Sequence, residues 1–121
     1  MSRPLLDESR LHPAIRDTVE HLHAEVVHNV QAASMSNAVL VVGMSGNPFC
    51  KRARKALDAA AVPHHYLEYG SYLSQWRQRL ALKMWSGWPT FPLVFVKGVQ
   101  IGGADDLAKL IASGELKRLL A

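Results

Sequence analysis

The chain has 121 residues, of which 49% are hydrophobic and 20% are charged, and its formal net charge at pH 7 is +4. This is the length of one domain with a single core and the composition of an ordinary soluble globular protein. The longest aliphatic run, 38–42, is far too short to span a bilayer, and residues 1–12 lack the apolar core of a signal peptide. We therefore expect a cytoplasmic protein that makes no contact with membranes.

The positive charge lies mainly at 51–55, 77–83 and 117–118, each within a predicted helix. These segments do not interleave aromatic and basic residues as single-strand nucleic-acid platforms do. We expect solvated helix faces or, second, a pocket for a small anion, and no nucleic acid. The single cysteine, Cys50, excludes an internal disulfide and a zinc site built from several thiolates.

The first predicted element is one N-terminal helix over about residues 13–33. Proline is tolerated in the first turn. His21 and His28 fall beside each other, but paired imidazoles on an exposed helix face are usually polar surface, so we expect no metal site. Apolar residues recur at three- and four-residue steps and form one stripe: Ile15, Val19, Leu22, Val26 and Val30.

The core of the domain is predicted to occupy about 37–121 and to begin with a strand. The continuous apolar run 38–42 suits a strand that is buried on both faces. After a short loop, Asn47 is a good N-cap and Pro48 suits the first helical position. The helix that follows, 48–60, is predicted to bury one apolar face, made of Phe49, Ala53, Ala56, Leu57 and Ala60.

The second half is predicted to contain a strand, a helix and a hairpin. Residues 65–69 alternate like a strand, and 72–84 form a helix rich in bulky residues and arginine. Beyond Pro92, a run of β-branched and aromatic residues is joined to a second short run by the two-residue link Lys97-Gly98, which indicates a β-hairpin.

The chain is predicted to end in helices. Gly102-Gly103 interrupts the strand pattern, and Asp105 or Asp106 can cap a helix over 105–112. Residues 115–120 form a last helical turn or two.

The order of elements predicts the fold class. Two strands linked by a helix should be parallel through a right-handed crossover, whereas the last pair is an antiparallel hairpin. The resulting four-stranded mixed sheet with helices on both faces is an α/β arrangement of the thioredoxin-like type, here with an extra N-terminal helix.

Sequence motifs in the second half resemble a known family. The run from Arg79 to Pro92 resembles the monothiol glutaredoxins without a gap, and Thr90-Phe91-Pro92 with a later Gly-Gly-x-Asp resembles the glutathione-binding half of a glutaredoxin. The resemblance extends from roughly Val19 to the end of the chain.

This resemblance implies a set of ligand contacts. Arg79 would pair with the glycine carboxylate of glutathione, because a guanidinium binds carboxylates in bidentate fashion. Phe91 would give its backbone groups to the cysteinyl unit, and Ala104 and Asp105 would take the γ-glutamyl end. Pro92 would follow a cis peptide bond. Without the resemblance, Arg79 is a surface ion-pair residue and Asp105 a plain N-cap.

The resemblance breaks at the active-site loop. Asn47-Pro48-Phe49-Cys50 falls on the family's Cys-x-x-Cys or Cys-x-x-Ser motif, so Asn47 stands where the nucleophilic cysteine belongs. The basic residue that usually precedes the motif is replaced by Met44 or Ser45, and the loop is shorter than is usual for the monothiol class.

These losses change the expected chemistry. An asparagine amide cannot attack a disulfide, and it cannot give a thiolate to the iron–sulfur cluster that monothiol relatives assemble between two subunits. The resemblance therefore implies a glutaredoxin-related protein that binds glutathione or a thiol-containing protein near Pro92, with weak or lost redox activity. We expect no iron–sulfur cluster.

Two alternatives keep a role for Cys50. It lies at a helix start beside Lys51 and Arg52, which lower a thiol pKa, so it could be a displaced nucleophile in glutathione-dependent thiol–disulfide exchange. It could also hold an iron–sulfur cluster with glutathione in a dimer. The simpler interpretation is a small apolar side chain at the edge of the core.

Overall fold

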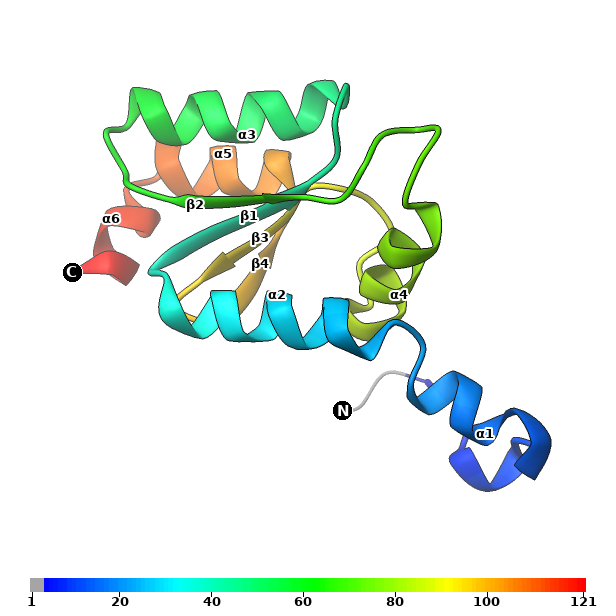
Figure 1. Ribbon diagram of the computed structural model, residues 1–121. Coiled ribbons are helices and arrows are strands. Elements are labelled where there is room, and N and C mark those ends of the chain that lie inside the picture. Colours follow the sequence, from blue (N-terminus) through cyan, green and yellow to red (C-terminus); the bar gives the residue numbers. More distant parts are fainter. Residues whose placement is uncertain (1–3) are drawn as a thin grey trace.

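The computed structural model describes residues 4–121, and its central element is a four-stranded mixed sheet (Figure 1). The strands lie in the order β2-β1-β3-β4, with β1 parallel to β2 and antiparallel to β3, and β3 antiparallel to β4. This confirms the predicted sheet. The strands are β1 (Val39–Gly43), β2 (His65–Glu68), β3 (Leu93–Val96) and β4 (Val99–Gly102).

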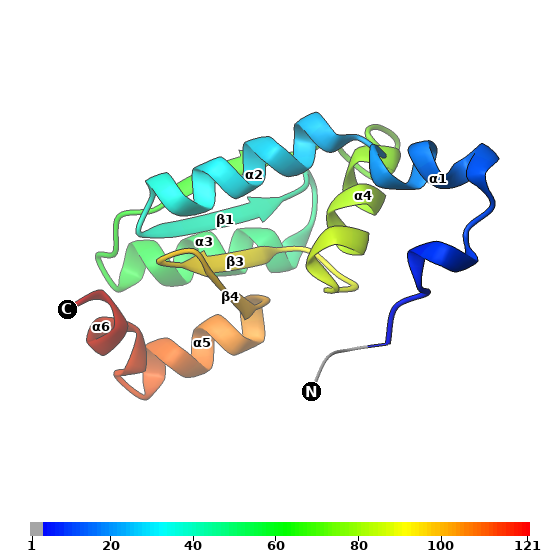
Figure 2. The ribbon, with the colours of Figure 1, turned by 90° about the horizontal axis from the view of Figure 1, so that it is seen from below.

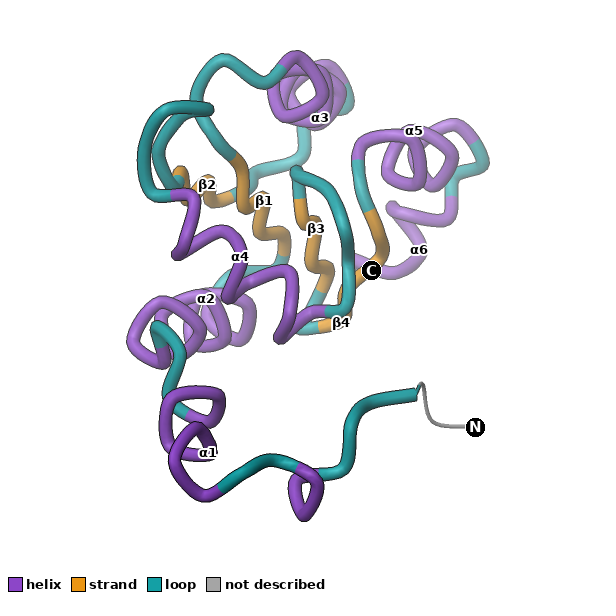
Figure 3. Tube along the Cα trace, turned by 90° about the vertical axis from the view of Figure 1, so that its right-hand side faces the viewer, coloured by secondary structure: helices purple, strands orange, loops and turns teal. Residues whose placement is uncertain are grey.

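Helices cover both faces of the sheet, and β1 and β3 are buried between them (Figures 1 and 3). On one face, α2 and α4 pack against Leu40, Val42 and Phe95, whereas α3, α5 and α6 pack against Val39 and Val41 on the other. Successive side chains of β1 point to opposite faces of the sheet and therefore belong to two separate hydrophobic clusters. These helices are α2 (Ala24–Ser36), α3 (Pro48–Ala59), α4 (Trp76–Ser86), α5 (Ala104–Ala112) and α6 (Glu115–Leu120).

The N-terminal region differs from the single helix expected over 13–33. It forms η1 (Glu8–Arg10), α1 (Pro13–Glu20) and, after a break at His23 with a left-handed φ of 44°, α2. Val26 and Val30 reach the core, but Ile15 and Val19 are exposed because α1 projects beyond the sheet (Figures 1 and 2). Residues of the predicted apolar stripe are therefore buried in α2 and exposed in α1.

Two further helix starts differ from expectation. α4 begins at Trp76 instead of residue 72, because Ser71 and Ser74 hold a turn in which the Ser74 hydroxyl accepts from the Ser71 N–H at 3.1 Å. α5 begins at Ala104, and its N-cap is Gly103 instead of an aspartate. Asp106 assists from the first turn, where its carboxylate accepts from the Gly103 N–H at 3.0 Å.

The hairpin forms as predicted. Lys97 and Gly98 have φ values of 49° and 80°, the left-handed pair that a tight two-residue hairpin turn requires. Within residues 4–121, no helix is both long and apolar enough to cross a membrane. The same part of the chain holds no group of three or more His, Cys, Asp or Glu residues placed to bind a metal ion.

Candidate functional site: a groove beside the cis-proline loop

A groove of about 190 Å³ opens where the loop before β3 meets the N-termini of α3 and α5. It brings together four of the five residues expected to bind glutathione, namely Phe91, Pro92, Ala104 and Asp105. The Phe91–Pro92 peptide bond is cis, as predicted. The remaining lining residues are Phe49, Trp88, Thr90, Gly103 and Asp106.

Phe91 presents its backbone to the groove while its ring packs inward. The residue is 5% exposed and belongs to the cluster between the sheet, α2 and α4. In the described chain, the hydrogen bonds of loops and caps include none to the Phe91 N–H or C=O. These groups are consequently available to an extended ligand, which could pair with them as a strand does.

Phe49 is an exposed wall of the groove. It was expected on the buried face of α3, but 49% of its surface is accessible. The first turn of a helix extends past the neighbouring elements, so a side chain there can lie outside the core that Ala53 and Leu57 occupy. The Arg52 guanidinium lies 5.0 Å from the centroid of the Phe49 ring, a cation–π distance.

Asn47 caps α3. Its Oδ1 accepts hydrogen bonds from the N–H groups of Phe49 at 2.8 Å and Cys50 at 3.1 Å. The residue is 9% exposed. Two N–H groups that the start of a helix leaves without partners are therefore satisfied by a neutral amide.

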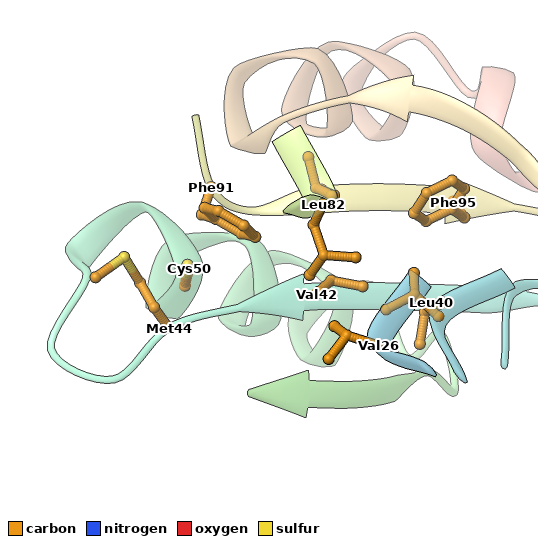
Figure 4. Close-up of a cluster of buried hydrophobic side chains, with 10 residues drawn as sticks. Val26, Leu40, Val42, Met44, Cys50, Leu82, Phe91 and Phe95 are labelled. Carbon is orange, nitrogen blue, oxygen red and sulfur yellow. The ribbon is translucent and has the colours of Figure 1, made fainter. Parts of the chain in front are cut away.

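Cys50 is buried more deeply than expected. Only 2% of it is exposed, and its side chain lies in the cluster with Met44, Phe91 and Leu82 (Figure 4). Burial raises the pKa of the Cys50 thiol above its ordinary value, because a thiolate is poorly solvated there. The flanking cations Lys51 and Arg52 do not offset this effect, since they point toward solvent.

Arg79 does not lie in the groove. It is 7% exposed, and its Nη1 donates to the carbonyl oxygens of Tyr69 at 2.8 Å and Ser74 at 2.6 Å. The guanidinium thereby fixes the connection between β2 and α4. Of the five expected ligand residues, it is the one that the fold separates from the others.

Sequence reasoning assigned no site role to three residues in or beside the groove, of which only Trp88 lines it. Lys83, one turn after Arg79, places its Nζ 5.8 Å from the centroid of the Phe91 ring. Trp88 lines the groove, and its Nε1 is buried without a hydrogen-bond partner in the described chain. Arg52 forms an ion pair with Asp105. Lys83 and Trp88 lie inside the recognised motif, so position was a usable signal, whereas the Arg52–Asp105 pair joins residues 53 apart in sequence.

Comparison with known proteins finds matches over most of the chain. Residues 39–101 match the Glutaredoxin family model. A glutaredoxin-like protein of Dictyostelium discoideum is 44% identical over 102 residues, covering 84% of this chain and 83% of the relative. Monothiol glutaredoxin-4 of Schizosaccharomyces pombe is 31% identical over 96 residues, which are 76% of this chain but only 39% of that protein.

A solved structure is similar as well. The crystal structure of a buckwheat glutaredoxin–glutathione complex matches with a TM-score of 0.71 and 25% sequence identity, covering 84% of this chain and 92% of that one. The likeness thus covers more of the chain than the segment that the family model matches.

Proposed function

The chain belongs to the glutaredoxin family, and we propose that it binds glutathione, or a thiol-containing protein, in the groove beside Pro92 with weak or no redox activity. The observation that carries the proposal is a groove in which the cis-proline loop and the start of α5 are in place while Asn47 occupies the start of α3. Binding groups are thus present where the family's thiol is missing.

The proposed ligand pose follows the polar groups of the groove. The free backbone of Phe91 pairs with the cysteinyl unit, and the first turn of α5, with Ala104 and Asp105, takes the γ-glutamyl end. The glycine carboxylate goes to Lys83, which lines a neighbouring pocket that shares Trp88 with the groove, because both hydrogen bonds of the Arg79 Nη1 are already made to backbone carbonyls. The buckwheat relative was solved as a glutathione complex, which supports this ligand class.

Weak or lost redox activity follows from the two residues at the start of α3. Asn47 has no thiol, and the Cys50 thiol is buried with a raised pKa, so neither supplies a reactive thiolate near neutral pH. One observation favours the rival function, thiol–disulfide exchange by Cys50: this residue lies in the first turn of α3, where a thiolate is stabilised.

The iron–sulfur cluster of monothiol relatives does not fit the residues present. A bridging cluster needs a thiolate exposed at the groove. Asn47 offers an amide oxygen already engaged by two N–H groups, and Cys50 faces the interior. We therefore assign no cluster to this chain.

Calorimetric titration of reduced glutathione into the purified protein tests the proposal. We expect saturable heat at millimolar ligand, and weaker binding by Asp105→Asn than by the control Asp58→Asn, which makes the same charge change elsewhere on the surface. Absence of heat from the wild type at millimolar glutathione would sink the proposed function.

A further inference from the structure

An ion pair crosses the rim of the groove. The Arg52 Nη2, on α3, donates to the Asp105 Oδ1 in the first turn of α5. The same guanidinium lies 5.0 Å from the ring centroid of Phe49, which lines the groove. α3 and α5 run beside each other on one face of the sheet (Figure 3). A cation and an anion are therefore held together at the rim of the groove.

Both members of this pair are open to solvent. The side chain of Arg52 is 54% exposed and that of Asp105 is 78% exposed. Exposed ion pairs contribute little stability, because water solvates both charges well. A ligand can accordingly separate the pair at low cost if it gives each charge a new partner.

We propose that Arg52 and Asp105 together form a receptor for a zwitterionic amino-acid head, with Arg52 as a specificity-determining residue; this inference rests on the proposed function. The ligand's α-ammonium pairs with the Asp105 carboxylate, and its α-carboxylate pairs with the Arg52 guanidinium. Both ligand charges sit on one carbon, so one inserted group replaces one ion pair with two. The γ-glutamyl end of glutathione carries this pair of charges.

The geometry also predicts which ligands bind more weakly. A ligand end with an ammonium alone takes Asp105 away from Arg52 and leaves the guanidinium without its acid. An end with a carboxylate alone leaves Asp105 unpaired in the same way. Specificity for the zwitterion thus comes from the second ion pair, which a ligand end with a single charge cannot form.

The first turn of α5 adds to the carboxylate side. Its N–H groups lie at the start of a nine-residue helix, where unpaired donors and the helix dipole favour negative charge. Phe49 keeps the guanidinium at the groove through its cation–π contact. Arg54, by contrast, lies 4.0 Å from the centroid of the Tyr66 ring, which is outside the groove. It is therefore a matched control.

The test measures two tripeptides against three proteins by calorimetry under reducing conditions. The tripeptides are glutathione and 4-aminobutyryl-Cys-Gly, which lacks only the α-carboxylate. The proteins are the wild type, Arg52→Gln and the control Arg54→Gln, which has the same net charge. We expect Arg52→Gln to weaken glutathione binding about fivefold, the size of one exposed ion pair. Binding of 4-aminobutyryl-Cys-Gly to Arg52→Gln should stay unchanged or tighten, since Asp105 is then free.

The possible results separate the two proposals. If the wild type binds glutathione but Arg52→Gln and Arg54→Gln behave alike, or Arg52→Gln weakens both tripeptides equally, the role of Arg52 is wrong and the proposed function stands. If the wild type binds no glutathione, both fall. Both arginines are exposed, so the variants should unfold at the wild-type temperature, and a thermal scan checks this.

Discussion

Asn47 caps α3 at the position where we propose that the family's nucleophile is missing. Its amide oxygen holds the N–H groups of Phe49 and Cys50 at 2.8 and 3.1 Å. The same two donors would stabilise a thiolate at this position, because a helix N-terminus favours negative charge. The chain therefore retains the electrostatic surroundings of a reactive thiol without the thiol.

Asn47→Cys should restore part of the chemistry. We expect glutathione-dependent reduction of a small mixed disulfide by the variant and little or none by the wild type. Loss of the amide cap costs about 1 kcal/mol, which a domain of this size tolerates.

Asn47→Ser is the matched control, since it keeps a capping oxygen and adds no thiol. Equal activity in the wild type and Asn47→Cys would identify Cys50 as the nucleophile. Inactivity of a folded Asn47→Cys would place the defect in the rest of the site.

Cys50 should make stability depend on alkaline pH. Burial raises the pKa of its thiol in the folded state, whereas the unfolded thiol titrates near about 8.5. Above that pH the unfolded state binds fewer protons than the folded state, so the free energy of unfolding falls as pH rises. Below it both states are protonated, and the effect disappears.

Urea unfolding of the wild type and Cys50→Ala at about pH 7 and about pH 9.5 checks this. The wild type should lose more stability over the interval than Cys50→Ala, and alkylation of the native thiol should be slow. Tyr69 also has a raised pKa, but both proteins contain it, so its contribution cancels in the comparison. The pKa of Tyr66 is raised mainly by burial and in part by the Cys50 charge, so the difference between the two proteins includes this coupling. Equal losses would show that Cys50 ionises freely in the fold.

At the scale of elements, Arg79 joins β2 to α4. Its buried guanidinium satisfies the carbonyls of Tyr69 and Ser74. Arg79→Leu should lower the free energy of unfolding by about 2–4 kcal/mol, because two part-buried carbonyls lose a charged donor. We expect little change in glutathione binding once the variant is folded.

Arg77→Leu is the control on the same helix, where the exposed Arg77 lies over the Trp76 ring. Its stability should change by less than about 0.5 kcal/mol. If Arg79→Leu has normal stability but no longer binds glutathione, Arg79 contacts the ligand and its proposed structural role is wrong.

The sequence predicted those elements whose signals are local. The hairpin depends on the Lys97-Gly98 turn, and the start of α3 on Asn47-Pro48, so both formed where expected. The start of α4 was placed too early because bulky residues from 72 onward fit a helix pattern, whereas the Ser71–Ser74 turn and the Arg79 contacts hold that segment apart. The Arg79 side chain, from the helix that follows, helps to set the start of α4, and hydrophobic periodicity carries no signal for such a contact.

At the scale of the molecule, the groove forms where three separate segments meet. The cis-proline loop and the start of α5 carry recognisable motifs, so Phe91, Pro92, Ala104 and Asp105 could be assigned together from the sequence. Their partner from α3 could not be assigned. Arg52 reaches Asp105 only because both helices lie on the same face of the sheet.

The N-terminal region stands apart from this core. Every residue from 4 to 23 whose side-chain exposure is described is exposed or half-buried, and α1 projects away from the sheet (Figure 1). The core begins with Val26 and Val30 of α2. Val19 and Leu22 touch the body at a shallow pocket beside Met84 and Trp85.

Truncation to residues 24–121 should therefore leave the fold and the groove intact. We expect its free energy of unfolding to lie within about 1 kcal/mol of that of the full chain, because no fully buried apolar side chain is described before Val26. Leu40→Ala, which empties a 0% exposed site, should cost about 2–5 kcal/mol and serves as the positive control. Urea unfolding measures both, and glutathione titration should give the same affinity for the truncated and full chains. If truncation costs as much as Leu40→Ala, the contacts of Val19 and Leu22 with α4 belong to the core, and the break at His23 is a bend within one packed unit.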